Sequence, residues 1–180
     1  MQEHKYQDLI AVFNQTFFAD FNTRLEKGDH EPIYLPAQVQ YEDYASAAHH
    51  RIVFAHGFYA SGLHEIAHWL VAGEARRLKV DFGYWYIADG RNAKQQAAFE
   101  KVEIVPQAIE WILAVAAGFP YRVSADNLSG ISIDRLGFQH KIHDQVKAYL
   151  ENGLSCRIQS LVSALQAFYQ TTAITLTGFA

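Results

Sequence analysis

The feature that most constrains this chain is the segment Ser61–Glu74, in which His64 and His68 stand four residues apart. The residues around them are mostly apolar and Gly73 closes the run, which predicts a helix that ends near Ala72. Residues four apart lie on one face of a helix, so both imidazoles can point at one ion. Two imidazoles without partners in apolar surroundings would be costly, and a shared metal would satisfy both.

A metal site of this kind needs a third protein ligand and an open position for water or substrate. Glu74 lies just past the expected end of the helix, where the chain can reverse and return a carboxylate to the histidines. We predict Glu74 as the third ligand and hold Glu103 as the rival. Two imidazoles and one carboxylate are typical of non-haem Fe(II) oxygenases, although zinc peptidases use the same donors. Glu65, rotated away from the ligand face, would be the general base in such a peptidase.

The rest of the pattern predicts an α+β fold in which helices pack on a small mixed sheet. At 180 residues, half of them apolar, the chain is long enough for one full hydrophobic core. We therefore expect a single compact domain spanning residues 1–180, with Ser61 as the N-cap of the histidine helix and Pro106 in the first turn of a later one. The expected elements are helices at residues 6–25, 61–72, 106–117, 133–150 and 154–170, and strands at residues 51–55 and 80–87.

Charge and hydropathy exclude several classes of protein. The 15 basic and 19 acidic residues give a net charge of −4, so we expect no stable binding of nucleic acid through a coat of lysine and arginine. The single cysteine cannot form an internal disulfide or a thiolate metal cluster. No apolar run reaches the roughly 18 residues needed to span a bilayer, and the first residues lack the layout of a secretory signal. We expect a cytoplasmic protein without membrane contact.

The order of several separate motifs resembles the elongation factor P hydroxylase family. The resemblance covers nearly the whole chain and is densest between His64 and Gly130. It is carried by His64-Glu65-Ile-Ala-His68-Trp69, by Ala72-Gly73-Glu74-Ala-Arg76-Arg77, by Asp81-Phe-Gly-Tyr-Trp-Tyr86 with Asp89-Gly90-Arg91, by the stretch from Phe99 to Trp111, and by Ser124-x-Asp126-Asn127-Leu128-x-Gly130.

The resemblance implies a metal-dependent monooxygenase that uses Fe(II) and O2 to hydroxylate the β-lysylated lysine of bacterial elongation factor P. The family's two histidines and one glutamate correspond here to His64, His68 and Glu74. It also implies a fold similar to that of the bacterial rRNA-maturation endoribonuclease family, whose motif is His-x3-His-x5-His. Glutamate replaces the third histidine in this chain, and that departure favours iron and oxygen chemistry over hydrolysis.

A lysine substrate would need apolar walls for its alkyl stem and carboxylates for its amines. The aromatic candidates for the walls are Trp69, Tyr84 and Tyr86, and the acidic candidates for the amines are Asp89, Glu100 and Glu103. Three other functions remain open from the sequence. They are a zinc peptidase that uses Glu65, a metal-dependent endoribonuclease, and a non-enzymatic binding module in which zinc or another divalent ion is structural.

Overall fold

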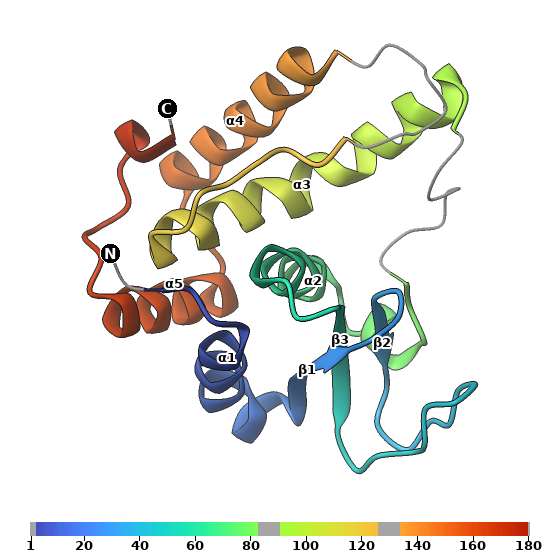
Figure 1. Ribbon diagram of the computed structural model, residues 1–180. Coiled ribbons are helices and arrows are strands. Elements are labelled where there is room, and N and C mark those ends of the chain that lie inside the picture. The colour runs from blue at the N-terminus through green and yellow to red at the C-terminus, as the bar shows by residue number, and fades with distance from the viewer. Residues whose placement is uncertain (1–2, 83–90, 126–133, 180) are drawn as a thin grey trace.

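The structure is a computed structural model that describes residues 3–82, 91–125 and 134–179. Five α-helices, three strands and two short 3-10 helices follow one another in this part of the chain (Figure 1). In chain order they are α1 (Tyr6–Phe21), β1 (Thr23–Gly28), β2 (Ile33–Leu35), β3 (His50–Ala55), α2 (Tyr59–Val71), η1 (Arg76–Leu78), α3 (Ala93–Ala117), α4 (Arg135–Asn152), α5 (Cys156–Tyr169) and η2 (Leu176–Phe179).

The three strands form a small mixed sheet in the order β1-β3-β2. The central strand β3 pairs in parallel with β1 and antiparallel with β2. Ile52, Val53 and Phe54 of β3 are all buried, which suits a central strand covered on both faces. This arrangement confirms the predicted α+β fold with a small mixed sheet.

Helix α2 lies at the centre of the molecule, between the sheet and the long helix α3 (Figure 1). Leu63, Ile66, Ala67 and Leu70 of α2 are all buried in the main hydrophobic core. The core is shared with the helices α1, α3, α4 and α5. Helices α1 and α3 pack against α2, and α4 and α5 pack against α3. The histidine helix is therefore held on several sides, and the position of its side chains is set by this packing.

The first two predicted helix boundaries are wrong by a few residues. The helix expected at residues 6–25 ends at Phe21, because Asn22 adopts a left-handed conformation with φ 47°. Leu25, the last residue of the expected apolar stripe, lies instead in β1 and is buried. Ser61 is not the N-cap of α2, since that helix starts at Tyr59. Its Oγ accepts a hydrogen bond of 3.1 Å from the backbone N–H of Ala55 and so ties α2 to the end of β3.

Helix α3 begins much earlier than the predicted helix at residues 106–117. It starts after Asn92, whose side chain accepts from the backbone of Gln95 while the Gln95 side chain accepts from the backbone N–H of Asn92. This capping box fixes a start that apolar spacing alone did not indicate. Pro106 lies inside the helix and not in its first turn. Gly118 follows with φ 67°, so the helix ends at Ala117, which is also the end of the predicted helix.

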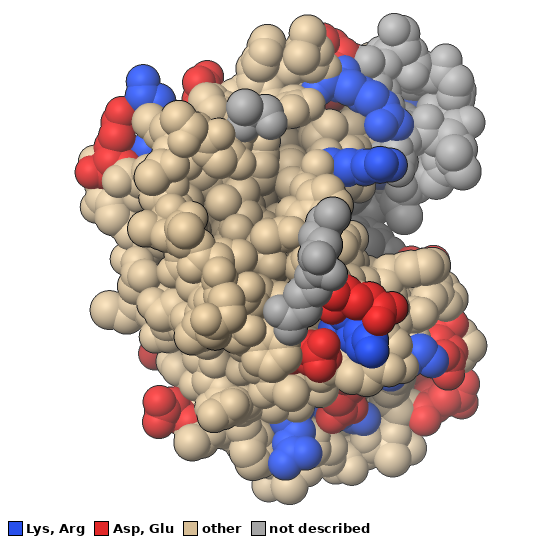
Figure 2. Space-filling view, turned by 60° about the vertical axis from the view of Figure 1, so that its left-hand side comes forward, with Lys and Arg blue, Asp and Glu red and all other residues tan. Residues whose placement is uncertain are grey.

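Two further predictions concern the strand at residues 80–87 and the absence of a membrane-spanning segment. Of the strand expected at residues 80–87, the structure describes an antiparallel bridge between Asp81 and Tyr34, and residues 83–90 lie outside the described part. Among the helices that the structure describes, none is long and apolar enough to cross a membrane. On the face shown in Figure 2, small groups of acidic and basic side chains are scattered over a mostly uncharged surface.

Candidate metal centre

His64 and His68 of α2 meet the carboxylate of Glu103, which projects from α3. The Nε2 atoms of the two imidazoles lie 3.0 Å apart. Glu103 Oε1 lies 3.3 Å from Nε2 of His68, and Glu103 Oε2 lies 3.8 Å from Nε2 of His64. Within the described residues, these three form the one group of histidine and carboxylate side chains whose ligand atoms could hold a metal ion.

The distances between the ligand atoms of the three side chains suit a shared divalent ion. Ligand atoms that each lie about 2 Å from one ion are roughly 3 Å apart, as the Nε2 and carboxylate oxygen atoms are here. Only 1% of Glu103 is exposed, and a buried carboxylate is costly unless a cation balances its charge. A bound ion would balance that charge and satisfy both imidazoles at once.

Glu110 fixes the orientation of His64 from the outer side of the ring. Its Oε2 lies 2.8 Å from Nδ1 of His64, and a carboxylate can only accept, so Nδ1 carries the proton. Nε2, the atom that faces the group, is therefore the nitrogen that would bind a metal ion. Burial disfavours the charged imidazole, but Glu110, Glu65 and Glu103 outweigh this effect and raise the pKa of His64 to about 10.

Gln107 connects Glu103 to the chain segment that follows α3. Its fully buried side chain donates from Nε2 to Glu103 Oε2 at 3.3 Å and to the backbone carbonyl of Ser124 at 2.7 Å. Its Oε1 accepts from the Ser124 backbone N–H at 3.0 Å and from the Tyr121 hydroxyl at 3.1 Å. All of the polar capacity of this buried amide is used, so Gln107 holds both the carboxylate and the segment in place.

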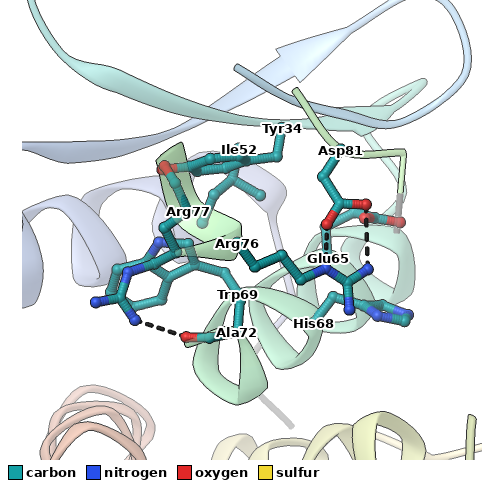
Figure 3. Close-up of a pocket in the computed structure, with 9 residues that line it drawn as sticks. All are labelled: Tyr34, Ile52, Glu65, His68, Trp69, Ala72, Arg76, Arg77 and Asp81. Atoms are coloured by element: carbon teal, nitrogen blue, oxygen red, sulfur yellow. Dashed lines mark hydrogen bonds and ion pairs between the residues drawn. The ribbon is translucent and has the colours of Figure 1, made fainter. Parts of the chain in front are cut away.

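A pocket opens beside the metal group, between α2 and the sheet (Figure 3). His68 belongs both to the group and to the pocket wall. Apolar and aromatic side chains make up one part of the lining, and charged side chains make up the other. The lining residues are Tyr34, Ile52, Glu65, His68, Trp69, Ala72, Arg76, Arg77 and Asp81.

The structure does not bring Glu74, the predicted third ligand, to the histidines. Glu74 is exposed just after α2 and lines a different hollow, together with Asp20, His50 and Arg77. The chain does not turn back after Gly73, because Arg76 and Arg77 begin the short helix η1. The rival carboxylate, Glu103, lies next to the two histidines instead. It belongs to α3, a separate helix whose position cannot be predicted from the spacing of the motif.

The remaining predicted site residues lie outside the metal group. Glu65 and Trp69 line the pocket, and burial raises the pKa of the Glu65 carboxyl although the charges of His64 and His68 oppose the shift. Glu100 lies one turn before Glu103 on α3 and pairs at 3.6 Å with Lys141 of α4. The predicted substrate-binding residues Tyr84, Tyr86 and Asp89 lie outside the described residues.

Glu110 and Gln107 were not predicted from the sequence. One signal pointed to Glu110, because it is the charged residue in the apolar stretch from Ala108 to Ala117, where a carboxylate needs a partner. It also stands seven residues after Glu103, a spacing that places both on one helix face. Gln107 carried no such signal, since its partners include backbone groups of Ser124.

Comparison with known proteins identifies the family of this chain. The profile of the family described as Elongation factor P hydroxylase matches residues 12–179. A protein from Haemophilus influenzae, named Elongation factor P lysine hydroxylase, is 56% identical over 169 residues, which cover 94% of this chain and 92% of the relative. The matched region includes every residue of the metal group and of the adjacent pocket.

Proposed function

The chain belongs to the elongation factor P hydroxylase family, and we propose that it hydroxylates a lysine side chain of elongation factor P. In this reaction one atom of O2 enters a C–H bond of the side chain, and the other atom leaves as water. An external reductant supplies the two electrons, and two protons complete the balance. The observation that carries the proposal is the buried group of His64, His68 and Glu103 inside the matched region.

We propose that His64, His68 and Glu103 hold Fe(II). Two imidazoles and one carboxylate are the donors that non-haem iron oxygenases use, and they leave positions open on the ion. When bound there, Fe(II) supplies the activation of O2 that the protein's own side chains cannot provide. Because zinc accepts the same donors, the metal must be identified by experiment and not by the ligands alone.

The chain's own residues prepare the site. Glu110 keeps the proton of His64 on Nδ1, and Gln107 holds one oxygen of Glu103. The core around α2 excludes water from the inner side of the group, which limits the loss of reactive species to solvent. The pocket beside His68 offers an approach for a side chain of the substrate.

The substrate form that we propose is elongation factor P whose lysine already carries β-lysine. This form adds an alkyl chain with free amines, and the pocket offers both apolar walls and carboxylates. A translation factor as substrate would place the enzyme in the cytoplasm. We also propose that residues 1–180 form one hydroxylase domain, which is supported by a hydrophobic core shared among α1, α2, α3, α4 and α5.

The test is anaerobic reconstitution of the protein with Fe(II), followed by addition of O2, a chemical reductant and β-lysylated elongation factor P. We expect the substrate to gain the mass of one oxygen atom, and the product to carry label from 18O2. Protein loaded with zinc, and a His64→Ala variant, should give no mass gain. Hydrolysis of a peptide or an RNA by zinc-loaded protein, with no oxygen transfer by iron-loaded protein, would contradict the proposal.

A further inference from the structure

Glu65 is a carboxylate in the pocket wall that has no hydrogen-bond or ion-pair partner among the residues that the structure describes. It follows His64 directly on α2, but it is not part of the metal group. Neither a hydrogen bond nor an ion pair from the described residues reaches it. Glu103 and Glu110, the neighbouring carboxylates on α3, both have partners. A half-buried carboxylate that opens into a pocket is satisfied most directly by a cation from outside.

The pocket wall next to Glu65 is largely apolar. Trp69 and Ile52 are almost fully buried and present apolar surface to the pocket, and Tyr34 and Ala72 extend it (Figure 3). The lining therefore combines an apolar wall with an acidic group near the metal centre.

The other charges of the pocket are engaged. Arg76 forms an ion pair with Asp81 through two of its nitrogens, as the dashed lines in Figure 3 show. Arg77 donates a hydrogen bond of 2.6 Å to the backbone carbonyl of Ala72, and its guanidinium lies 5.9 Å from the centre of the Trp69 ring. Glu65 is thus the charged side chain of this pocket to which the described residues make no hydrogen bond or ion pair.

We propose that Glu65 binds the terminal ammonium of the substrate's alkyl chain and so determines the specificity of the enzyme. The assignment to a lysine substrate rests on the proposed function, whereas the ammonium site rests on the pocket itself. Because Glu65 and His68 line one pocket, an amine bound at Glu65 brings its neighbouring methylene groups beside the metal group. The glutamate of the HExxH motif then acts as a substrate-binding residue and not as the general base of a peptidase.

The kinetic test compares Glu65→Gln, Glu65→Asp and wild-type protein on β-lysylated elongation factor P and on the same substrate with its free amines acetylated. Gln keeps the shape but removes the charge, so we expect KM for the free amine to rise about tenfold to a hundredfold. Preference over the acetylated substrate should disappear in Glu65→Gln and return in part in Glu65→Asp. Glu151→Gln, which removes an exposed carboxylate at the end of α4, is the matched control.

Two outcomes of that experiment overturn the proposal. A loss of kcat with unchanged KM would mean that Glu65 takes part in the chemical step instead. A loss of bound metal, measured by elemental analysis of Glu65→Gln, would mean that it supports the ion. Melting curves followed by circular dichroism establish that each variant is folded.

A binding test that needs no turnover separates this inference from the proposed function. Zinc-loaded protein is titrated with n-butylammonium and, separately, with butyrate. We expect n-butylammonium to bind wild-type protein and to bind Glu65→Gln about tenfold or more weakly, with butyrate binding neither. Binding of butyrate, or equal binding of n-butylammonium to both proteins, overturns the ammonium site. If the amine binds as expected but no oxygen transfer occurs in wild-type protein, the proposed function fails and the site stands.

Discussion

Glu110 of α3 accepts a hydrogen bond of 2.8 Å from Nδ1 of His64 across the interface of α2 and α3. The same face of α3 presents Glu103 to Nε2 of both histidines. One helix therefore supplies a carboxylate to each side of the His64 ring. Carboxylates behind a ligating histidine fix its tautomer and increase its basicity, which strengthens its bond to a metal.

Substitution of Glu110 should weaken metal binding without abolishing it. In Glu110→Ala the Nδ1–H of His64 loses its acceptor and the ring is no longer held, so affinity should fall about tenfold to a hundredfold. Glu110→Gln keeps an acceptor and should lose less. Competition with a chelator measures the dissociation constant, and an affinity equal to that of wild-type protein in Glu110→Ala would refute the role.

The metal content of variants shows whether Glu103 or Glu74 is the third ligand. We expect Glu103→Gln to lose affinity beyond the roughly tenfold to hundredfold that removal of a supporting partner costs, because a ligand itself is removed. Glu74→Gln should retain stoichiometric metal, since Glu74 lines a different hollow. Elemental analysis after dialysis against a weak chelator measures the metal bound to each of the two variants. The opposite result would restore the prediction made from the spacing of the motif.

Gln107→Leu should lower both stability and metal affinity. The substitution removes the hydrogen bonds to the N–H and carbonyl of Ser124 and to the Tyr121 hydroxyl, at about 1 kcal/mol for each hydrogen bond lost. Tyr121→Phe removes only one of these hydrogen bonds and is the milder comparison. Urea unfolding gives the free energies. A Gln107→Leu protein as stable as Tyr121→Phe would show that the amide does not hold this segment.

Arg157 of α5 stabilises the last turn of α2. Its guanidinium donates to the backbone carbonyls of Leu70 and Ala72 at 2.9 and 3.1 Å and lies 5.0 Å from the centre of the Trp69 ring. Arg157→Lys keeps the charge but loses the planar fork, so the free energy of unfolding should drop by about 1–2 kcal/mol. Arg122→Lys, at an exposed position, should change little. Equal unfolding midpoints for the two variants would contradict this role.

His50 should make the fold less stable in mild acid. Burial, together with the charges of Arg77 and His49, lowers the pKa of His50 below its ordinary value of 6.5. Its Nδ1 accepts a hydrogen bond from the backbone N–H of Ala37, which requires the neutral ring. The unfolded chain therefore takes up a proton first as pH falls, so stability is complete above pH 6.5 and declines below it.

A His50→Gln variant checks this pH dependence, because all other titrating groups remain. The free energy of unfolding of wild-type protein, measured in urea from neutral pH down to mild acid, should fall more steeply than that of the variant. Parallel curves would show that His50 has the same proton affinity in the folded and unfolded chains.

The sequence by itself determined the local structure of the site. Apolar periodicity and the closing glycine defined a helix with His64 and His68 on one face, and the structure confirms that helix at Tyr59–Val71. It also indicated the α+β class, the stop of α3 at Gly118 and the two late helices. These features depend on residues a few positions apart, whose interactions are set by backbone geometry.

Only the tertiary structure decided which carboxylate meets the histidines. Spacing favoured Glu74, the nearer residue in sequence, but the chain enters η1 there, and α3 packs on α2 with Glu103 and Glu110 facing inward. Which helix faces which depends on how the whole core fills space, and no local pattern encodes that choice. The same packing places the Glu65 carboxylate in a pocket where none of the described residues forms a hydrogen bond or ion pair with it, a property that the HExxH motif alone does not specify.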